Sequence, residues 1–220
     1  MGRPKKITPT IEKAPARLNG LADILPEHHL PWDFFLEKFH GLAITFGYAR
    51  VETPLVEDAR LFNLWVQSTN DQLLMFADEK GTKLALKPTN LLSLARVYLD
   101  HHFFEKERVC KWFYVSPVAY LKNNGEVDQQ LEWGLQIFGE TNPIADVQMI
   151  NLLLKLFTQN SLPNLSVEIN NIGCLECSPA YIEVLRNFFK EKKYDLCENC
   201  LEHLENNPLN ILACDNLSCN

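Results

Sequence analysis

The chain has 220 residues, of which 46% are hydrophobic and 22% are charged, as in ordinary globular proteins with a sizeable core. The net charge is −7; residues 1–17 carry +4, so subtracting +4 from −7 leaves −11 on residues 18–220. So acidic a body is a poor nucleic-acid surface, and no apolar run approaches the ~20 residues that cross a membrane.

Residues 1–17 are basic and contain several prolines, which predicts a disordered tail. An RNA contact by this arm is the alternative. The segment lacks the apolar core of a secretion signal, so we expect a cytoplasmic location.

Apolar residues at helical spacing predict an amphipathic helix from Pro31 to Phe46, which Gly47 ends. The residues that follow predict a group of strands. The further elements are, in chain order, a strand over 48–58 broken by Pro54, a strand over 82–88, a helix over 89–98 and a strand over 108–117.

The stretch "YLKNNGEVDQQLEWGLQIFGE" (120–140) predicts a hairpin. From Leu131 onward, apolar and polar residues alternate as in a strand with two distinct faces. Asn123-Asn124-Gly125 before it is typical of a turn. Gripping a triphosphate needs cations, yet this stretch holds four acidic residues and the single cation Lys122.

Beyond the hairpin we predict a helix around 147–157, a strand over 165–170, and a helix with Ser178 as its N-cap and Pro179 at its first position. The strands lie largely in one consecutive group, with helices before and after it. This order predicts an α+β fold around an antiparallel sheet.

Six of the seven cysteines lie in the last 47 residues of a chain without a secretory signal, which favours metal binding over disulfides. Two C-x-x-C pairs, separated by 19 residues, match the spacing of tetrahedral zinc sites. The predicted ligands of a structural zinc ion are Cys174, Cys177, Cys197 and Cys200. Whether Cys214 or Cys219 replaces one of them stays open, and the alternative is two pairs of ordinary thiols.

Several motifs follow one another in a recognisable order. Gly20, Asp23 and Pro26 form a Gly-x-x-Asp-x-x-Pro element, which runs into "LADILPEHHLPWDFF". "FGYARVETPLVEDARLF" contains a Gly-Tyr strand that ends in Pro54. The hairpin comes next, and "VEINNIGCLEC" and "NNPLNILACDN" close the series. Over residues 18–216 this series resembles the catalytic core of histidyl-tRNA synthetases, which are class II aminoacyl-tRNA synthetases.

The resemblance implies a class II synthetase-like antiparallel sheet flanked by helices. Residues 18–170 would form a partial synthetase core. Residues 171–220 would form a small helical insertion segment stapled by zinc through four cysteines.

The same resemblance locates the positions that bind ATP in the family. Tyr120 stands where the family has an arginine for the α-phosphate, and Lys122 stands where it has a glutamate that helps to seat adenine. The next conserved arginine of the loop falls at Glu126, which reverses the charge. Adenylate formation needs positive charge around the phosphate, and loss of one such donor can cost ~10²–10³ in rate.

The positions for histidine recognition differ as well. The Gln and Glu that hold the amino group and the imidazole fall at Glu132 and Gln136, and the Arg-Pro-Glu-Gly-Thr element corresponds to residues 87–91, Lys-Pro-Thr-Asn-Leu. With the sequence ending at Asn220, we also expect motif 3 to be absent. We therefore assign no catalytic and no cofactor-binding residue, and we expect ATP and magnesium not to bind.

These departures predict a truncated synthetase paralogue that acts as a non-catalytic binding or regulatory subunit. One alternative is a regulatory subunit similar to that of ATP phosphoribosyltransferase in histidine biosynthesis, which would sense histidine. Another is one half of a split histidine–tRNA ligase. The resemblance makes the Pro54 region the expected face of a homodimer or of a heterodimer with a synthetase or a histidine-biosynthesis enzyme. A contact with tRNA stays open, and no membrane partner is expected.

Overall fold

The computed structural model of the protein describes residues 16–69, 71–106, 109–170, 173–216 and 219. Most of the predicted tail, residues 1–17, lies outside the described residues. The chain divides into two units, Met1–Leu165 and Ser166–Asn220, and the predicted boundary between residues 170 and 171 falls close to this division. Among the described residues, no helix is long and apolar enough to cross a membrane.

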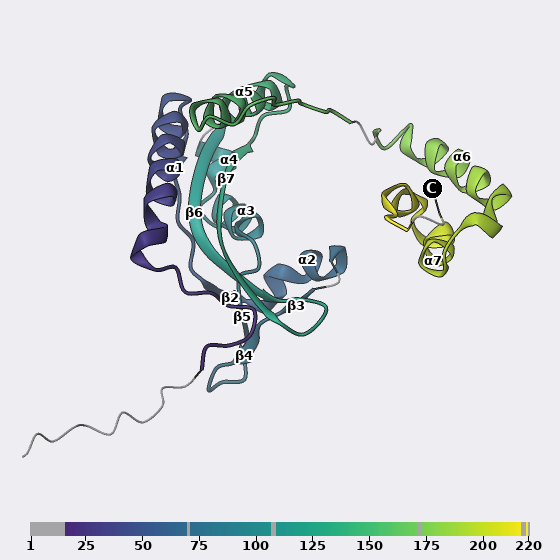
Figure 1. Ribbon diagram of the computed structural model, residues 1–220, viewed down its shortest axis with the longest axis horizontal. Coiled ribbons are helices and arrows are strands. Elements are labelled where there is room, and N and C mark those ends of the chain that lie inside the picture. The colour runs from purple at the N-terminus through teal and green to yellow at the C-terminus, as the bar shows by residue number, and fades with distance from the viewer. Residues whose placement is uncertain (1–15, 70, 107–108, 171–172, 217–218, 220) are drawn as a thin grey trace, which may run out of the picture. The chain divides into compact units, whose positions relative to one another are not determined.

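The first unit is built around a long antiparallel hairpin (Figure 1). Its strands β6 (Cys110–Leu121) and β7 (Val127–Phe138) are paired along their whole length. The loop closes tightly because the N–H of Gly125 donates to the carbonyl of Lys122 at 2.8 Å, and Gly125 adopts a φ of +80°, a conformation that favours glycine. The predicted hairpin is therefore confirmed, and its second strand begins at Val127.

The other strands lie beside this hairpin or form a second sheet. β1 (Ala49–Arg50) is parallel and β3 (Gln72–Leu73) is antiparallel to β6, which completes a four-stranded sheet. The second sheet has the order β2-β5-β4 and is entirely antiparallel, with strands β2 (Val56–Asp58), β5 (Lys83–Leu86) and β4 (Met75–Ala77). Antiparallel pairs dominate, which confirms the predicted α+β class.

Helices cover both faces of the hairpin. The helical segments of the first unit are α1 (Pro26–Thr45), the 3-10 turn η1 (Ala59–Phe62), α2 (Asn63–Ser68), α3 (Asn90–Asp100), α4 (Phe103–Lys106) and α5 (Ile144–Gln159). α1 and α5 pack on one face of the hairpin and α3 packs on the other, as Figure 1 shows. Side chains on a strand alternate between its faces, so one run of β6 serves both layers.

The core follows from this alternation. Phe113 points toward α1 and α5, where it joins fully buried Phe39 and Leu152. Its neighbours Trp112 and Tyr114 point the other way, into a cluster with Leu94 of α3. The ring of Phe39 makes edge-to-face contacts with Phe113 and Trp133 at centroid distances of 5.8 and 5.1 Å.

One predicted helix boundary and one predicted strand differ from the structure. The first helix begins at Pro26 instead of Pro31, and Pro31 lies inside it. Pro26 fits the first turn of the helix, because its missing N–H costs nothing there. Residues 165–170 form no strand, and Ile169 is 81% exposed. An alternating segment becomes a strand only where another strand completes its hydrogen bonds, and none of the described residues pairs with this one.

The second unit is helical and small. Its segments are α6 (Ser178–Glu191), η2 (Lys193–Asp195), α7 (Glu198–Asn206) and η3 (Pro208–Ala213). Their apolar sides meet in one cluster of five buried residues, Leu185, Phe189, Cys200, Leu204 and Ile211. The predicted helix is confirmed, with Pro179 in its first turn, but its N-cap residue is Cys177 and not the predicted Ser178.

Candidate functional site

Two polar regions carry the residues that the sequence points to, and the first is the tip of the β6–β7 hairpin. The Tyr120 hydroxyl donates to Asp128 Oδ2 at 3.1 Å and accepts from Gln130 Nε2 at 2.9 Å. Lys122 Nζ forms an ion pair with the same carboxylate at 3.1 Å, and this hydrogen bond raises the pKa of Lys122. Asp128 lies directly opposite Tyr120 in the strand register, so the hairpin's own carboxylate holds both groups.

Glu126 lies in the exposed loop. Its carboxylate accepts from Asn124 Nδ2 at 2.9 Å, and its backbone N–H donates to Asn124 Oδ1 at 3.0 Å. These contacts are local turn chemistry. The loop therefore presents a carboxylate at the position where the resemblance implies the next conserved arginine of the loop.

Glu132 lies further along β7 and binds the start of α3. Its two carboxylate oxygens accept from the backbone N–H of Asn90 at 2.7 Å, from Asn90 Nδ2 at 2.6 Å and from the Thr89 hydroxyl at 3.1 Å. A negative charge is favoured at a helix N-terminus, where backbone N–H groups lack partners within the helix. Glu132 thus acts as a remote cap of α3.

Lys87 is the buried cation of this region, with no exposed surface. Its Nζ donates to Ser116 Oγ at 2.7 Å and to the hydroxyl and carbonyl of Thr53 at 2.9 and 3.1 Å. Burial lowers the pKa of Lys87, and the charges of Glu132 and Glu57 oppose this shift. All three protons of the ammonium group can be donated inside the protein.

The burial of Lys87 was not predicted, although the sequence carries a signal for it. In "TKLALKP" a period of two places Lys87 on the same strand face as Ala85, which is fully buried. The lysine therefore had to find internal acceptors.

In the middle of the hairpin, Tyr114 of β6 approaches Gly134 of β7 closely. Tyr114 lies opposite Gly134, and a Cβ at Gly134 would lie 2.5 Å from the tyrosine hydroxyl. Gln136 is half-buried on the same face of β7. Only glycine leaves room for the Tyr114 ring at this point.

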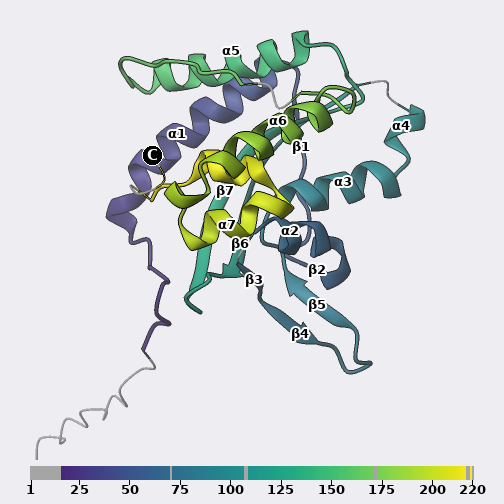
Figure 2. The ribbon, with the colours of Figure 1, turned by 90° about the vertical axis from the view of Figure 1, so that its right-hand side faces the viewer.

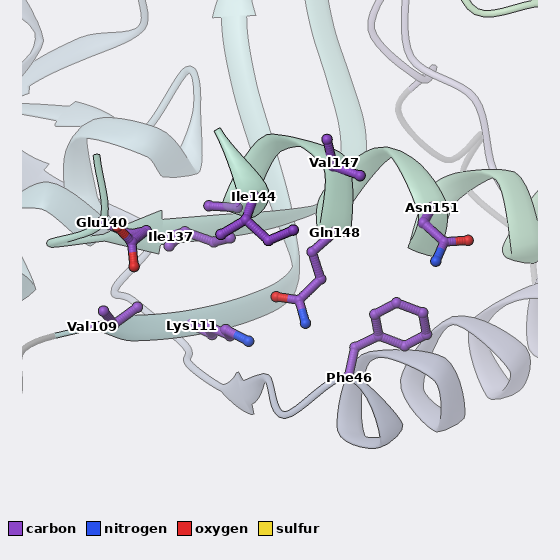
Figure 3. A pocket seen from close by; sticks show the side chains of 10 residues that line it. Phe46, Val109, Lys111, Ile137, Glu140, Ile144, Val147, Gln148 and Asn151 are labelled. Carbon is purple, nitrogen blue, oxygen red and sulfur yellow. The ribbon is translucent and has the colours of Figure 1, made fainter. Parts of the chain in front are cut away.

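A cavity of about 470 Å³ lies at another place in the first unit, where the C-terminal end of α1 meets α5 and β6. Figure 3 shows Gln148 extending from α5 toward Phe46, with Lys111 nearby. Ile137 and Ile144 supply apolar surface. None of the positions that the resemblance assigns to ATP or histidine lines this cavity.

The second polar region is a group of four cysteines in the second unit. The Sγ atoms of Cys197, Cys200, Cys214 and Cys219 all lie within 4.8 Å of one another, and Cys197 Sγ is 3.9 Å from Cys214 Sγ. Tetrahedral zinc with Zn–S bonds of ~2.3 Å places its sulfur atoms ~3.8 Å apart. The four thiols can therefore hold a metal ion, and zinc suits them well. We refer to them as the four-thiol site.

Local structure explains how the site forms. Cys197 is the N-cap residue of α7 and Cys200 lies in its first turn, so both thiols lie at one helix end. Cys214 ends η3, and the backbone N–H of Cys197 donates to Cys219 Sγ at 3.0 Å. The backbone N–H of Cys200 contributes most to lowering the pKa of Cys197 to about 7, whereas burial raises the pKa of Cys200.

The structure does not bring the four predicted zinc ligands together in one group. Cys197 and Cys200 lie together as expected, but their described neighbours are Cys214 and Cys219. Cys174 and Cys177 form an exposed pair of their own, with their Sγ atoms 3.5 Å apart. Spacing favoured the two short pairs, whereas the turn after η3 brings the more widely spaced pair to the site.

The fold, a long antiparallel hairpin between helical layers, is that of the catalytic core of class II aminoacyl-tRNA synthetases. The histidyl-tRNA synthetase family model matches residues 20–212, and the chain therefore belongs to that family. It is 31% identical over 206 residues to the histidine–tRNA ligase of Clostridium novyi and 32% identical over 206 residues to that of Dehalococcoides mccartyi. These matches cover 91% of this chain and 50% and 49% of the relatives, so the chain spans about half of their length.

Two solved structures share this fold. The apo histidyl-tRNA synthetase of S. aureus matches with a TM-score of 0.70 and 22% identity, covering 91% of this chain and 48% of that one. An ATP phosphoribosyltransferase regulatory subunit/histidyl-tRNA synthetase from Bacillus halodurans matches with a TM-score of 0.65 and 21% identity, covering 88% and 50%. At these identities the likeness shows the fold alone.

Proposed function

We propose that this chain is a pseudoenzyme of the histidyl-tRNA synthetase family, a non-catalytic subunit that acts in the cytoplasm by binding a partner. The observation that carries the proposal concerns the positions that the resemblance assigns to ATP and histidine binding. Polar side chains at these positions are bound to other groups of the same chain. Asp128 holds Tyr120 and Lys122, and Glu132 caps α3. Groups committed to internal bonds are poor ligands for a nucleotide or an amino acid, because the bonds must break first.

The experiment is an isothermal calorimetric titration of the purified 220-residue chain with magnesium-ATP, with histidine, and with both. The S. aureus histidyl-tRNA synthetase serves as the positive control. We expect no saturable heat from this chain. Micromolar ATP binding would contradict the proposal and would favour a split ligase completed by a second polypeptide.

A second candidate function is a histidine-sensing regulatory subunit. The fold likeness to the Bacillus halodurans ATP phosphoribosyltransferase regulatory subunit/histidyl-tRNA synthetase supports it. Histidine would need an acceptor for its amino group, and the carboxylate of Glu132 is already bound to α3. Saturable histidine binding without ATP binding in the same titration would favour this candidate.

The proposed partner surface is the second sheet of the first unit, next to Pro54. Its edge strands expose large apolar side chains, among them Val56 on β2 and Phe76 on β4. Figure 2 shows β4 and β5 projecting as a hairpin from the first unit. We propose a homodimer through this surface, because exposed apolar groups of this kind mark interfaces.

Sedimentation velocity tests the dimer. Phe76→Asp should convert a dimer into a monomer, and Tyr194→Asp, at an exposed position of the second unit, is the matched control. A wild-type chain that sediments as a monomer at all concentrations would contradict the homodimer. A heterodimer with a synthetase or a histidine-biosynthesis enzyme would then be sought by co-purification.

We further propose that the four-thiol site holds a structural zinc ion. Four thiolates close a tetrahedral site and leave no position for a substrate. The ion would tie the start of α7 to the turn after η3, in addition to the small apolar cluster and the hydrogen bond from the Cys197 N–H to Cys219 Sγ. Zinc quantification on the purified chain should give one ion per chain, and a chain without metal that stays folded would contradict this role.

A further inference from the structure

The pair Cys174 and Cys177 has a different environment from the four-thiol site. Both side chains are exposed, and their sulfur atoms face each other at 3.5 Å. In contrast, Cys200 is buried, and the other three cysteines of the four-thiol site are half-buried. Of the two C-x-x-C motifs, one therefore lies in a thiol cluster and the other presents two neighbouring thiols to solvent.

A tight turn at the start of α6 holds this pair together. The backbone N–H of Ser178 donates to the carbonyl of Cys174 at 2.8 Å, and the N–H of Cys174 donates to Cys177 Sγ at 3.1 Å. Gly173 has a φ of +85°, and a Cβ there would lie 2.9 Å from Cys177 Sγ. The glycine thus provides the space in which the two sulfur atoms meet.

Metal coordination does not need this pair if the four-thiol site is occupied as proposed above. Tetrahedral zinc takes four ligands, and Cys197, Cys200, Cys214 and Cys219 supply them. The exposed pair offers two sulfur atoms, and among the described residues no third cysteine, histidine or carboxylate completes a metal site with them. Two exposed thiols in a C-x-x-C turn are instead suited to disulfide chemistry.

We propose that Cys174 and Cys177 form a reversible disulfide site that exchanges with low-molecular-weight disulfides, separate from the four-thiol site. The inference rests on the zinc assignment given under Proposed function. A disulfide needs an S–S distance of ~2.05 Å, so the sulfur atoms must approach by about 1.5 Å, which side-chain rotation on an exposed turn can supply.

The reaction balances with a small disulfide as the oxidant. One cysteine, as the thiolate, attacks a sulfur of the small disulfide, which gives a mixed disulfide and releases one small thiol. The second cysteine then attacks the bonded protein sulfur and releases the other small thiol. The protein loses two electrons and two protons, and both small thiols leave protonated.

The test uses the zinc-loaded 220-residue chain in buffers with rising ratios of glutathione disulfide to glutathione. Free thiols are alkylated after each incubation, the peptides are quantified by mass spectrometry, and bound zinc is measured in parallel. We expect the peptide with Cys174 and Cys177 to become an internal disulfide while zinc stays at one ion per chain. Buried Cys110 should stay reduced and serves as the internal control.

Variants make the outcome decisive. Cys174→Ser should abolish the internal disulfide and trap a glutathione adduct on Cys177, with the zinc content unchanged. Loss of zinc in the Cys174→Ser/Cys177→Ser double variant would overturn the proposal and make the pair ligands. Wild-type cysteines that stay reduced in excess glutathione disulfide, or that stop at the mixed disulfide, would also overturn it.

A trivalent arsenical gives a readout without oxidation. Phenylarsine oxide joins two thiols through its arsenic atom and releases water, so the wild-type chain should take up one arsenical at this pair and Cys174→Ser none. Bound zinc reports on the four-thiol site, and the quantified peptides report on the exposed pair. Failure of the proposed zinc site is thus seen separately from failure of the disulfide site.

Discussion

The two units of this protein differ in what holds them together. The first unit buries large side chains completely, among them Phe39, Leu94 and Leu152, between two helical layers and a sheet. The second unit, residues 166–220, has five buried residues in its cluster, and one of these is Cys200. Small units bury a smaller fraction of their surface, and a metal ion often supplies the missing stability.

The two units also differ in how their polar side chains are bound. In the first unit, Lys122 and Glu132 lie at positions that the resemblance assigns to ATP and histidine binding. Both side chains bind other parts of the same unit and add to its stability. In the second unit, four thiols lie within 4.8 Å of one another and are suited to a metal ion. The first unit should therefore fold without a metal ion, whereas the second should depend on the proposed zinc ion.

Metal removal should have the largest effect. Chelation of zinc should unfold the second unit, because structural zinc in small domains contributes on the order of 10 kcal/mol to folding. Hydrogen exchange measured by mass spectrometry should show rapid exchange in α6 and α7 and unchanged protection in β6 and β7. Cys200→Ser should reproduce the effect and Cys177→Ser should not. Equal loss of protection in both units would remove the distinction between them.

Truncation of Phe39 should have the opposite selectivity. Phe39→Ala removes a fully buried ring at the centre of the first unit and should destabilise it by about 3–5 kcal/mol. All four tryptophans lie in the first unit, so tryptophan emission during urea unfolding reports on that unit. Phe34→Ala on the exposed side of α1 is the control, and it should change stability by less than about 0.5 kcal/mol. Altered zinc affinity in Phe39→Ala would show that the units are coupled.

The fold could be predicted from the sequence where its pattern was periodic. Alternation from Leu131 and the Asn-Asn-Gly turn predicted the hairpin, since a buried face imposes a period of two on a strand. The same period wrongly predicted a strand over residues 165–170, because a pattern does not reveal whether another strand is available.

The two sites were less predictable. The spacing of Cys197 and Cys200 indicated half of the four-thiol site, since short spacing reflects a local turn. Cys214 and Cys219 reach it through the path of the chain after η3, which spacing does not encode. The role of Glu132 as a cap of α3 also joins residues far apart in the sequence, so only the fold reveals it.

Substitution of Glu132 should have an intermediate effect. Glu132→Gln removes the charge that accepts from Asn90 and Thr89, and hydrogen bonds to charged groups contribute ~1.5–3 kcal/mol each. We expect a loss of about 2 kcal/mol in the urea unfolding of the first unit. Glu126→Gln, which alters an exposed loop carboxylate, is the matched control and should be neutral. If instead Glu132→Gln leaves stability unchanged and histidine then binds, the carboxylate blocks a functional site and is no structural cap.

The smallest effect is a pH dependence confined to the first unit. Burial, and to a lesser degree the charge of Arg50, lowers the pKa of His40 below 6.5. His40 lies against the rings of Phe39 and Phe113, at centroid distances of 6.2 and 5.3 Å. Because its pKa is depressed in the folded state, the unfolded chain binds the proton more readily. The stability present above pH 6.5 is therefore lost as the pH falls through the folded pKa.

The urea midpoint of tryptophan emission should accordingly decrease between pH 7 and pH 5, and His40→Gln should flatten this decrease. His101→Gln, at an exposed position, should leave it unchanged. Asp58 does not interfere in this range, because its hydrogen bond with Arg60 lowers its pKa to about 2, so its contribution is lost only in stronger acid. A decrease that persists unaltered in His40→Gln would assign the acid sensitivity to other groups. The contrast between the units would still hold if zinc release and tryptophan emission changed at different pH values. Thiolate ligands and a half-buried imidazole respond to protons independently.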